Sequence, residues 1–142
     1  MKALAEKFAN LLDQNLFDDA QQLMAEDCQY HYFEGDYSGR SNIIAIYRTN
    51  HNESRKLFDE ITYTSEVVPL TDNSCKVFFY DKFRIANKWH TYRCFQILRF
   101  EDDLIVEINH HELPEEMEKM REFYQIMKSR SSVAKFAEGM NS

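Results

Sequence analysis

The sequence predicts an α+β domain in which helices come first and a sheet follows. Apolar residues recur at helical spacing near the start of the chain, within residues 2–13. Three strand-like stretches follow one another later, at residues 75–85, 89–100 and 104–112. Short turns join these stretches, which is typical of an antiparallel meander.

The earlier elements can be assigned one by one. In chain order we expect a helix at 2–13, a short helix at 17–24, a strand at 29–33, a loop at 34–39, a third helix capped by Ser41 with Ile43, Ile46 and Tyr47 on its apolar face, and a strand at 58–70. The loop is the glycine-rich stretch of the chain, and Pro69 with a polar turn ends the strand. His51 and Asn52 follow the third helix, where we expect them to be solvated.

Each of the three later stretches has one face that is mostly apolar but broken by a polar residue. Because strand side chains alternate, these faces are Cys75, Val77, Phe79, Asp81, Phe83 and Ile85, then His90, Tyr92, Cys94, Gln96, Leu98 and Phe100, then Leu104, Val106, Ile108, His110 and Glu112. A carboxylate, an amide and an imidazole are costly to bury unless they are paired. The pattern therefore predicts a lined pocket.

The opposite faces carry large apolar groups as well, among them Phe78, Tyr80, Phe95 and Ile97. A sheet face of this kind is expected to be covered. We expect a second copy of the chain to cover it, which predicts a homodimer. The rival cover is a C-terminal helix, which Pro114 opens and which we expect to end near residue 128.

Composition limits the partners. The chain has 142 residues, enough for one domain with one core, and its net charge is −7. That charge argues against nucleic acid, whose binding needs clustered Lys and Arg, and against an anionic membrane surface. No apolar run is long enough to span a bilayer and we see no signal peptide. The three cysteines are widely spaced, as expected for free thiols, so we expect a cytoplasmic protein.

Three segments resemble the nuclear transport factor two-like superfamily, which includes SnoaL-like polyketide cyclases and ketosteroid isomerases. Phe8-Ala-Asn-Leu-Leu-Asp13 through Ala25-Glu-Asp27 is similar to the opening helix pair, and Ser38-Gly-Arg through Tyr47 to the Gly-Arg helix. Gln96 through Ile108 is similar to the closing hairpin, without its usual glycine. The resemblance covers residues 3–113. It implies a cone in which a curved sheet wraps around helices, with a pocket in its mouth and often a dimer, so residues 1–142 would form one SnoaL-like domain.

The resemblance also carries a negative implication about steroid-type isomerisation. At the positions of the isomerase's oxyanion tyrosine, general-base aspartate and oxyanion-hole aspartate, this chain has Phe8, Tyr32 and Gln96. Only the supporting tyrosine is kept, as Tyr47. That chemistry needs a carboxylate base over the substrate carbon, so it is not expected here. The same alignment turns Asp81, Tyr92, Gln96, His110 and Glu112 inward.

Asp81 and His110 are the candidate catalytic residues. Histidine could move a proton while the aspartate fixes its tautomer. Alternatively the two form a buried polar pair, or Asp81 reaches solvent at the rim, near Lys82 and Lys88. Asp81, His110 and Glu112 could together offer metal ligands, but there is no His-Glu-x-x-His and no cysteine pair, so we expect neither metal nor cofactor.

Tyr32, Tyr47, Tyr92, Gln96 and Glu112 are the candidate ligand-binding residues. The tyrosines could orient a planar molecule at the pocket mouth, together with Tyr30 and His90, or could simply fill the core. The leading hypothesis is a cofactor-independent acid/base enzyme for a small organic ligand: an isomerase, cyclase or dehydratase. The alternatives are a non-catalytic small-ligand-binding protein and a dimeric interaction domain.

Overall fold

The computed structural model describes the backbone of residues 1–140 and the side chains of residues 1–131. In chain order the elements are α1 (Lys2–Asp13), α2 (Phe17–Gln21), β1 (Met24–Tyr32), β2 (Gly35–Ser38), α3 (Arg40–Leu57), β3 (Glu60–Thr71), β4 (Ser74–Ile85), β5 (Lys88–Glu101), β6 (Leu104–Glu112), α4 (Pro114–Lys119) and α5 (Arg121–Met140). The predicted α+β class is confirmed.

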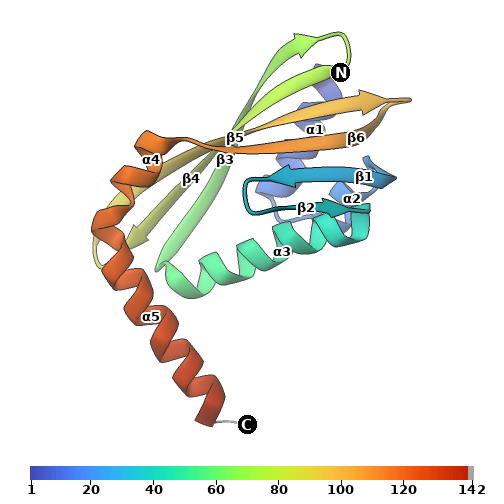
Figure 1. Cartoon of the computed structure of the whole chain (residues 1–142). Helices are drawn as coiled ribbons and strands as arrows, with labels where there is room; N and C mark the ends of the chain where they lie inside the picture. Colours follow the sequence, from blue (N-terminus) through green and yellow to red (C-terminus); the bar gives the residue numbers. More distant parts are fainter. Residues whose placement is uncertain (141–142) are drawn as a thin grey trace.

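The strands form one six-stranded sheet in the order β2-β1-β6-β5-β4-β3. Strands β3 to β6 are the predicted meander, because each neighbouring pair among them is antiparallel. β1 runs parallel to β6 and antiparallel to β2, so the sheet is mixed. The sheet is curved and unclosed, and α1 and α3 lie along its inner face (Figure 1).

The main core lies between this inner face and the two helices. α1 buries Ala5, Phe8, Ala9 and Leu12, which recur at helical spacing on one side of the helix. Together with the buried residues of α3 they pack against inner-face residues of the meander. The inner face is therefore filled over much of its length, and only a part of it remains open to a ligand.

The C-terminal helices pack near the other end of the inner face. Met120 and Phe123 form a second core cluster with Phe83 and Ile85 of β4. The Phe83 and Phe123 rings meet edge to face, with centroids 5.3 Å apart. α5 thus covers inner-face residues, whereas Phe78 and Phe95 lie half-buried on the outer face of the sheet. No helix of the described part of the chain is long and apolar enough to cross a membrane.

Several boundaries differ from the sequence-based expectation. The predicted loop at 34–39 contains strand β2, which pairs with β1. The third helix begins at Arg40 after Gly39, whose φ of 92° suits glycine, so Ser41 is not its cap. The helix also continues through His51 to Leu57. The C-terminal helix is two helices and extends to Met140 rather than ending near residue 128.

The inner face of β6 also differs, because the register shifts. Leu98 pairs with Ile108, but Phe100 pairs with Ile105, so an extra residue is inserted beside Val106. Ile105 is consequently fully buried in place of the predicted Leu104 and Val106. From Ile108 onward the predicted alternation holds, which keeps His110 and Glu112 on the inner face.

Candidate functional site

A cavity of ≈150 Å³ remains on the inner face between the sheet, the end of α1 and α3. Four of the predicted site residues line it, namely Tyr47, Asp81, Gln96 and His110. A cavity of this size can hold a molecule about as large as benzene. Strand alternation in β4, β5 and β6 and the helical repeat of α3 bring these side chains together, as the sequence predicts.

A continuous chain of hydrogen bonds crosses the cavity wall from α3 to β6. The Tyr47 hydroxyl donates to Gln96 Oε1 at 2.7 Å, and Gln96 Nε2 lies 3.1 Å from His110 Nδ1. His110 Nε2 lies 2.7 Å from Glu112 Oε1, and the Tyr92 hydroxyl donates to the other oxygen of Glu112. Gln96 is only 3% exposed, so its amide needs hydrogen-bond partners. Tyr47 and His110 supply them.

This chain fixes the tautomer of a neutral His110. Because the Gln96 amide nitrogen can only donate, His110 Nδ1 must accept, and the ring proton sits on Nε2 facing Glu112. Both ring nitrogens are therefore occupied. The predicted base–orienter contact between His110 and Asp81 does not form; Glu112 is the carboxylate that orients the imidazole.

Glu112 is held as a carboxylate by the same contacts. Burial alone would raise its pKa, but hydrogen bonds from His110 and Tyr92 outweigh burial and leave the pKa below its usual value. The hydroxyl of Tyr92 is committed to Glu112, and its ring packs beside the second core cluster. Tyr92 and Glu112 thus do not line the cavity; Glu112 contacts the lining residue His110, and Tyr92 contacts Glu112.

Asp81 is the unpaired group of the site. Among the described side chains its carboxyl has no hydrogen-bond or ion-pair partner, and it is partly exposed in the cavity. Burial raises its pKa from 3.8 to about 7, aided by repulsion from Asp13 and Glu112, while His110 acts in the opposite direction. An aspartate with such a pKa can both accept and release a proton near neutrality.

Asp13 is a site residue that the sequence reasoning missed. It is the last residue of α1 and lines the cavity, and Ser65 Oγ donates to its Oδ2 at 2.6 Å. Burial raises its pKa, although the Ser65 hydrogen bond opposes this. The available signal was its position four residues after Ala9, on the apolar side of the helix.

His51 and Tyr63 were missed as well. His51 lies inside α3 rather than beyond it, and its Nδ1 is 3.0 Å from the Tyr63 hydroxyl. Burial lowers the pKa of His51, and the charge of Arg55 lowers it further. The spacing of Tyr47 and His51, four residues apart on one helix, was the signal that could have placed His51 at the cavity.

Besides Tyr92, two further residues predicted at the pocket mouth, Tyr32 and His90, do not line the cavity. Tyr32 contacts His110 edge to face at 5.5 Å between ring centroids, but it does not line the cavity. His90 lies in the aromatic cluster under α5, with its ring centroid 5.6 Å from Phe83 and 5.4 Å from Phe123. Among the side chains of residues 1–131, no group of three or more His, Cys, Asp or Glu is arranged to hold a metal ion.

Comparisons with known proteins extend the assignment at the level of the fold. No protein-family model matches the chain, and no curated protein sequence does. Solved structures do match. A protein of Xanthomonas campestris pv. campestris, described provisionally as a polyketide cyclase, has 11% identity and a TM-score of 0.63, with 81% of this chain and 91% of that chain covered.

Two further structures agree. An NTF2-like protein of unknown function from Cytophaga hutchinsonii has 16% identity and a TM-score of 0.61, covering 78% of this chain and 96% of that one. An LEH-like epoxide hydrolase of M. tuberculosis has 13% identity and a TM-score of 0.61, covering 83% and 86%. The chain therefore has the cone fold of the nuclear transport factor two-like superfamily.

Proposed function

We propose that the protein is a cofactor-independent acid/base enzyme that moves a proton on a small organic carbonyl compound, as an isomerase, cyclase or dehydratase does. The observation that carries the proposal is the Asp81 carboxyl, which has no hydrogen-bond partner among the described residues. It lines a cavity large enough to hold a six-membered ring, and its pKa is raised to about 7. Perturbed titratable groups in cavities are typical of catalytic sites.

In this proposal Asp81 is the catalytic base and acid. As a carboxylate it takes a proton from a carbon next to the substrate carbonyl, and the electron pair of the broken C–H bond forms an enolate. The protonated Asp81 then returns the proton. Delivered to the far carbon of a conjugated dienolate, it completes a double-bond isomerisation; delivered to a hydroxyl on the next carbon, it releases water as that C–O bond breaks; and in ring closure the enolate carbon attacks a second carbonyl, whose oxygen takes the proton. None of these routes needs an oxidant or reductant.

The enolate oxygen needs a hydrogen-bond donor that is already in place. Tyr30 is the candidate, because it lines the cavity and its hydroxyl oxygen accepts a hydrogen bond from Gln96, which opposes the burial that raises the pKa of Tyr30. His110, predicted as the acid/base residue, is given a positioning role here: its Nδ1 holds the Gln96 amide. Tyr47 holds that amide from the other side, and Glu112 holds His110 in turn.

The structural neighbours support a proton-transfer proposal without specifying the reaction. One is described provisionally as a polyketide cyclase and another as an epoxide hydrolase, and both have the same cone fold. A fold of this kind can hold unrelated reactions, so the site residues rather than the fold support the choice.

Hydrogen–deuterium exchange tests the proposal without the natural substrate. Small cyclic ketones that fit the cavity, beginning with cyclohexanone, would be incubated with the protein in D₂O near neutrality and followed by ¹H NMR. We expect exchange next to the carbonyl to be faster than in buffer, and Asp81→Asn to remove about 10²–10⁴-fold of the acceleration. Asp103→Asn, in an exposed turn, is the matched control.

Two outcomes would contradict the proposal. Exchange at the buffer rate for every ketone, with binding visible by saturation-transfer NMR, would indicate the non-catalytic ligand-binding alternative. Equal acceleration by the wild type and the Asp81→Asn variant would remove Asp81 from the reaction.

A further inference from the structure

An open groove continues outward from the cavity. Its volume is ≈650 Å³, and it shares Asp13, Asn15, His51 and Tyr63 with the cavity lining. A ligand whose reacting part reaches Asp81 would therefore place the rest of its atoms in this groove. The groove wall decides what chemical group that outer part can carry.

Three acidic residues line the groove, and two of them, Asp59 and Glu60, are paired with arginines. Asp59 accepts from Arg130 Nη1 at 2.8 Å and from the Ala86 amide at 3.1 Å. Glu60 lies 3.7 Å from Arg84 Nε. Two carboxylates are thus balanced by two guanidinium groups, and Ser65 satisfies one oxygen of Asp13.

The basic residue of the groove is not paired. Arg55 lines the groove from the last turn of α3, and among the described residues it has no hydrogen-bond or ion-pair partner. It lies four residues after His51, so both side chains lie on the same side of the helix. Its charge lowers the pKa of His51, which places the guanidinium within electrostatic reach of the shared cavity mouth.

We propose that the substrate carries a carboxylate, which Arg55 binds in the groove while the reacting carbonyl end enters the cavity. A guanidinium matches a carboxylate with two parallel hydrogen bonds, so one free arginine suffices to select this group. The substrate class is therefore a small oxo acid. This inference rests on the proposed function for the reacting end, but the binding of the acid end can be tested separately.

The test compares two probes that differ only in charge: 4-oxocyclohexane-1-carboxylate and its neutral carboxamide. Their dissociation constants would be measured by NMR titration against the wild type, Arg55→Gln and Lys56→Gln. Lys56 is the matched control, because it carries the same charge on the next residue and does not line the groove. We expect Arg55→Gln to weaken binding of the carboxylate at least 10-fold, with the carboxamide unchanged and Lys56→Gln close to wild type.

The result that would overturn the inference is equal affinity of the wild type for both probes, or equal loss of carboxylate binding in the Arg55 and Lys56 variants. The titrations would be repeated on an Asp81→Asn background, where no reaction takes place. Binding that depends on Arg55 there, without ketone exchange in the wild type, would keep the carboxylate site and reject the enzyme. Ketone exchange that depends on Asp81, together with carboxylate binding that does not depend on Arg55, would keep the enzyme and reject the carboxylate site.

Discussion

At the scale of single residues, Asp81 and Glu112 differ in the hydrogen-bond partners of their carboxyl groups. Both are inner-face carboxyls, yet hydrogen bonds from His110 and Tyr92 stabilise the charge of Glu112, whereas Asp81 has no donor among the described residues. The two pKa values therefore move in opposite directions, to about 7 for Asp81 and below the usual value for Glu112. Such separation is what assigns acid and base roles in an enzyme.

The Asp81 pKa should be visible in the stability of the protein. Because the folded pKa is raised, the native state keeps a proton that the unfolded chain loses above about pH 4, so stability falls as pH rises from about 4 to 7. Asp81→Asn removes this loss. We expect the variant to match the wild type near pH 4 and to exceed it by about 2–4 kcal/mol at pH 8, measured by urea unfolding. Parallel pH curves for the two proteins would contradict the raised pKa.

The hydrogen-bond chain makes a second prediction at this scale. Gln96→Leu leaves the Tyr47 hydroxyl and His110 Nδ1 without their partner in a buried wall, and we expect it to lower the free energy of unfolding by about 2–4 kcal/mol. Tyr47→Phe removes one bond and should cost about 1 kcal/mol. If the hydrogen bonds are connected as described, the Gln96→Leu/Tyr47→Phe double variant will lose less free energy of unfolding than the sum of the two single losses. Strict additivity of the losses would contradict the connection.

At the scale of elements, the β4–β5 turn stores backbone strain that can be relieved. Ala86 and Asn87 have φ values of 50° and 66°, a region that glycine occupies freely and asparagine tolerates. Ala86→Gly should raise the free energy of unfolding by about 1 kcal/mol, measured by chemical denaturation. Asn87→Gly is the control and should change it less. A loss of stability in the Ala86 variant would show that the turn is not strained.

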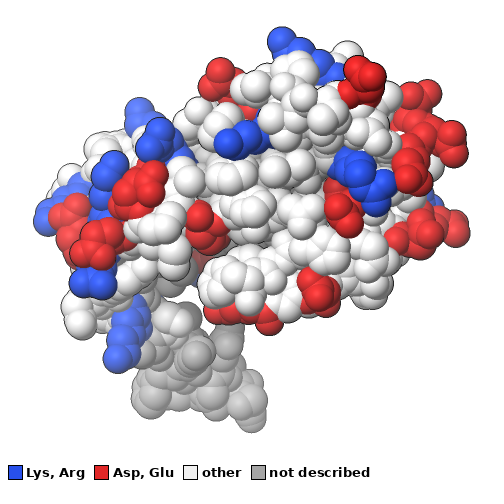
Figure 2. Space-filling view, turned by 45° about the horizontal axis from the view of Figure 1, so that its top comes forward, with Lys and Arg blue, Asp and Glu red and all other residues white. Residues whose placement is uncertain are grey.

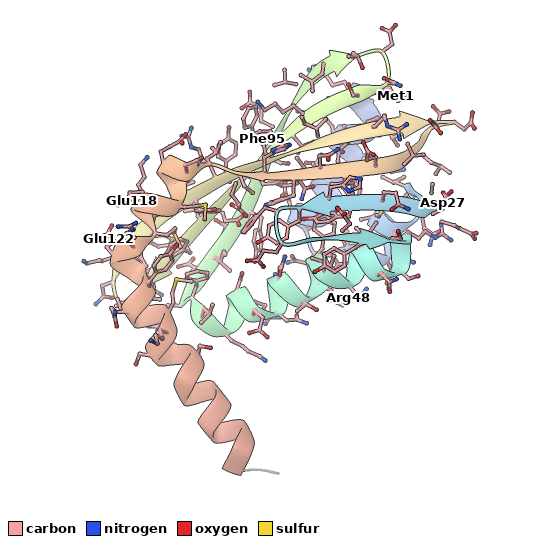
Figure 3. The ribbon with its side chains drawn as sticks, in the orientation of Figure 1. Met1, Asp27, Arg48, Phe95, Glu118 and Glu122 are labelled. Carbon is pink, nitrogen blue, oxygen red and sulfur yellow. The ribbon has the colours of Figure 1, made fainter. Side chains whose placement is uncertain are left out.

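The C-terminal helix α5 makes a separate prediction. Phe123 is 2% exposed between Phe83 and His90, whereas its neighbour Tyr124 is 46% exposed. Glu118 of α4 and Glu122 of α5 extend outward from the C-terminal helices (Figure 3). Phe123→Ala should cost about 3–5 kcal/mol and Tyr124→Ala less than about 1 kcal/mol in thermal unfolding. Equal, small effects would mean that the helix is not part of the cooperative core.

The elements were largely predictable, because alternation and helical spacing follow from backbone geometry. Alternation placed Asp81 and Gln96 on the inner face correctly. It failed at Val106, where an inserted residue turns Ile105 inward instead of Leu104 and Val106. The order of apolar residues in the sequence does not reveal this insertion. Alternation also could not predict that His110 binds Glu112 rather than Asp81. Both carboxyl groups lie on the same face as His110, and only side-chain packing selects between them.

At the scale of the whole molecule, the outer face of the sheet carries the half-buried aromatic residues Phe78 and Phe95, and α4 contacts this face through the Arg93–Glu116 ion pair. Phe95 stacks on His111 at 4.7 Å between centroids, with Lys76 Nζ 4.1 Å from its ring centroid. Phe95 lies on the side of the sheet away from α3 (Figure 3), and Figure 2 shows a broad uncharged area between groups of charged residues. We expect a second copy of the chain to cover this face.

Sedimentation velocity tests the dimer. Phe95→Glu places a charge in the centre of the proposed interface and should weaken self-association at least 100-fold, about 3 kcal/mol. Tyr124→Glu adds the same charge on α5, away from this face, and should leave the assembly unchanged. A monomeric wild type, or a Phe95→Glu variant that associates as the wild type does, would remove this interface.

The whole molecule also explains why part of the site could not be predicted. Asp13, His51 and Arg55 come from helices whose positions relative to the sheet are set by packing, and no local pattern in the sequence specifies which helical turn faces the cavity. The resemblance implied the cone and its pocket. Only the assembled structure brings the end of α1 and the last turns of α3 to the pocket mouth.

The titration of the Asp81 carboxyl tests the central claim most directly. The protein would be labelled with ¹³C at the aspartate carboxyl carbon, and the Asp81 signal would be assigned by its loss in the Asp81→Asn variant. We expect a titration midpoint near pH 7, about where the cavity places it. A midpoint near pH 4 would show an ordinary solvated aspartate, and the proton-transfer proposal would lose its base.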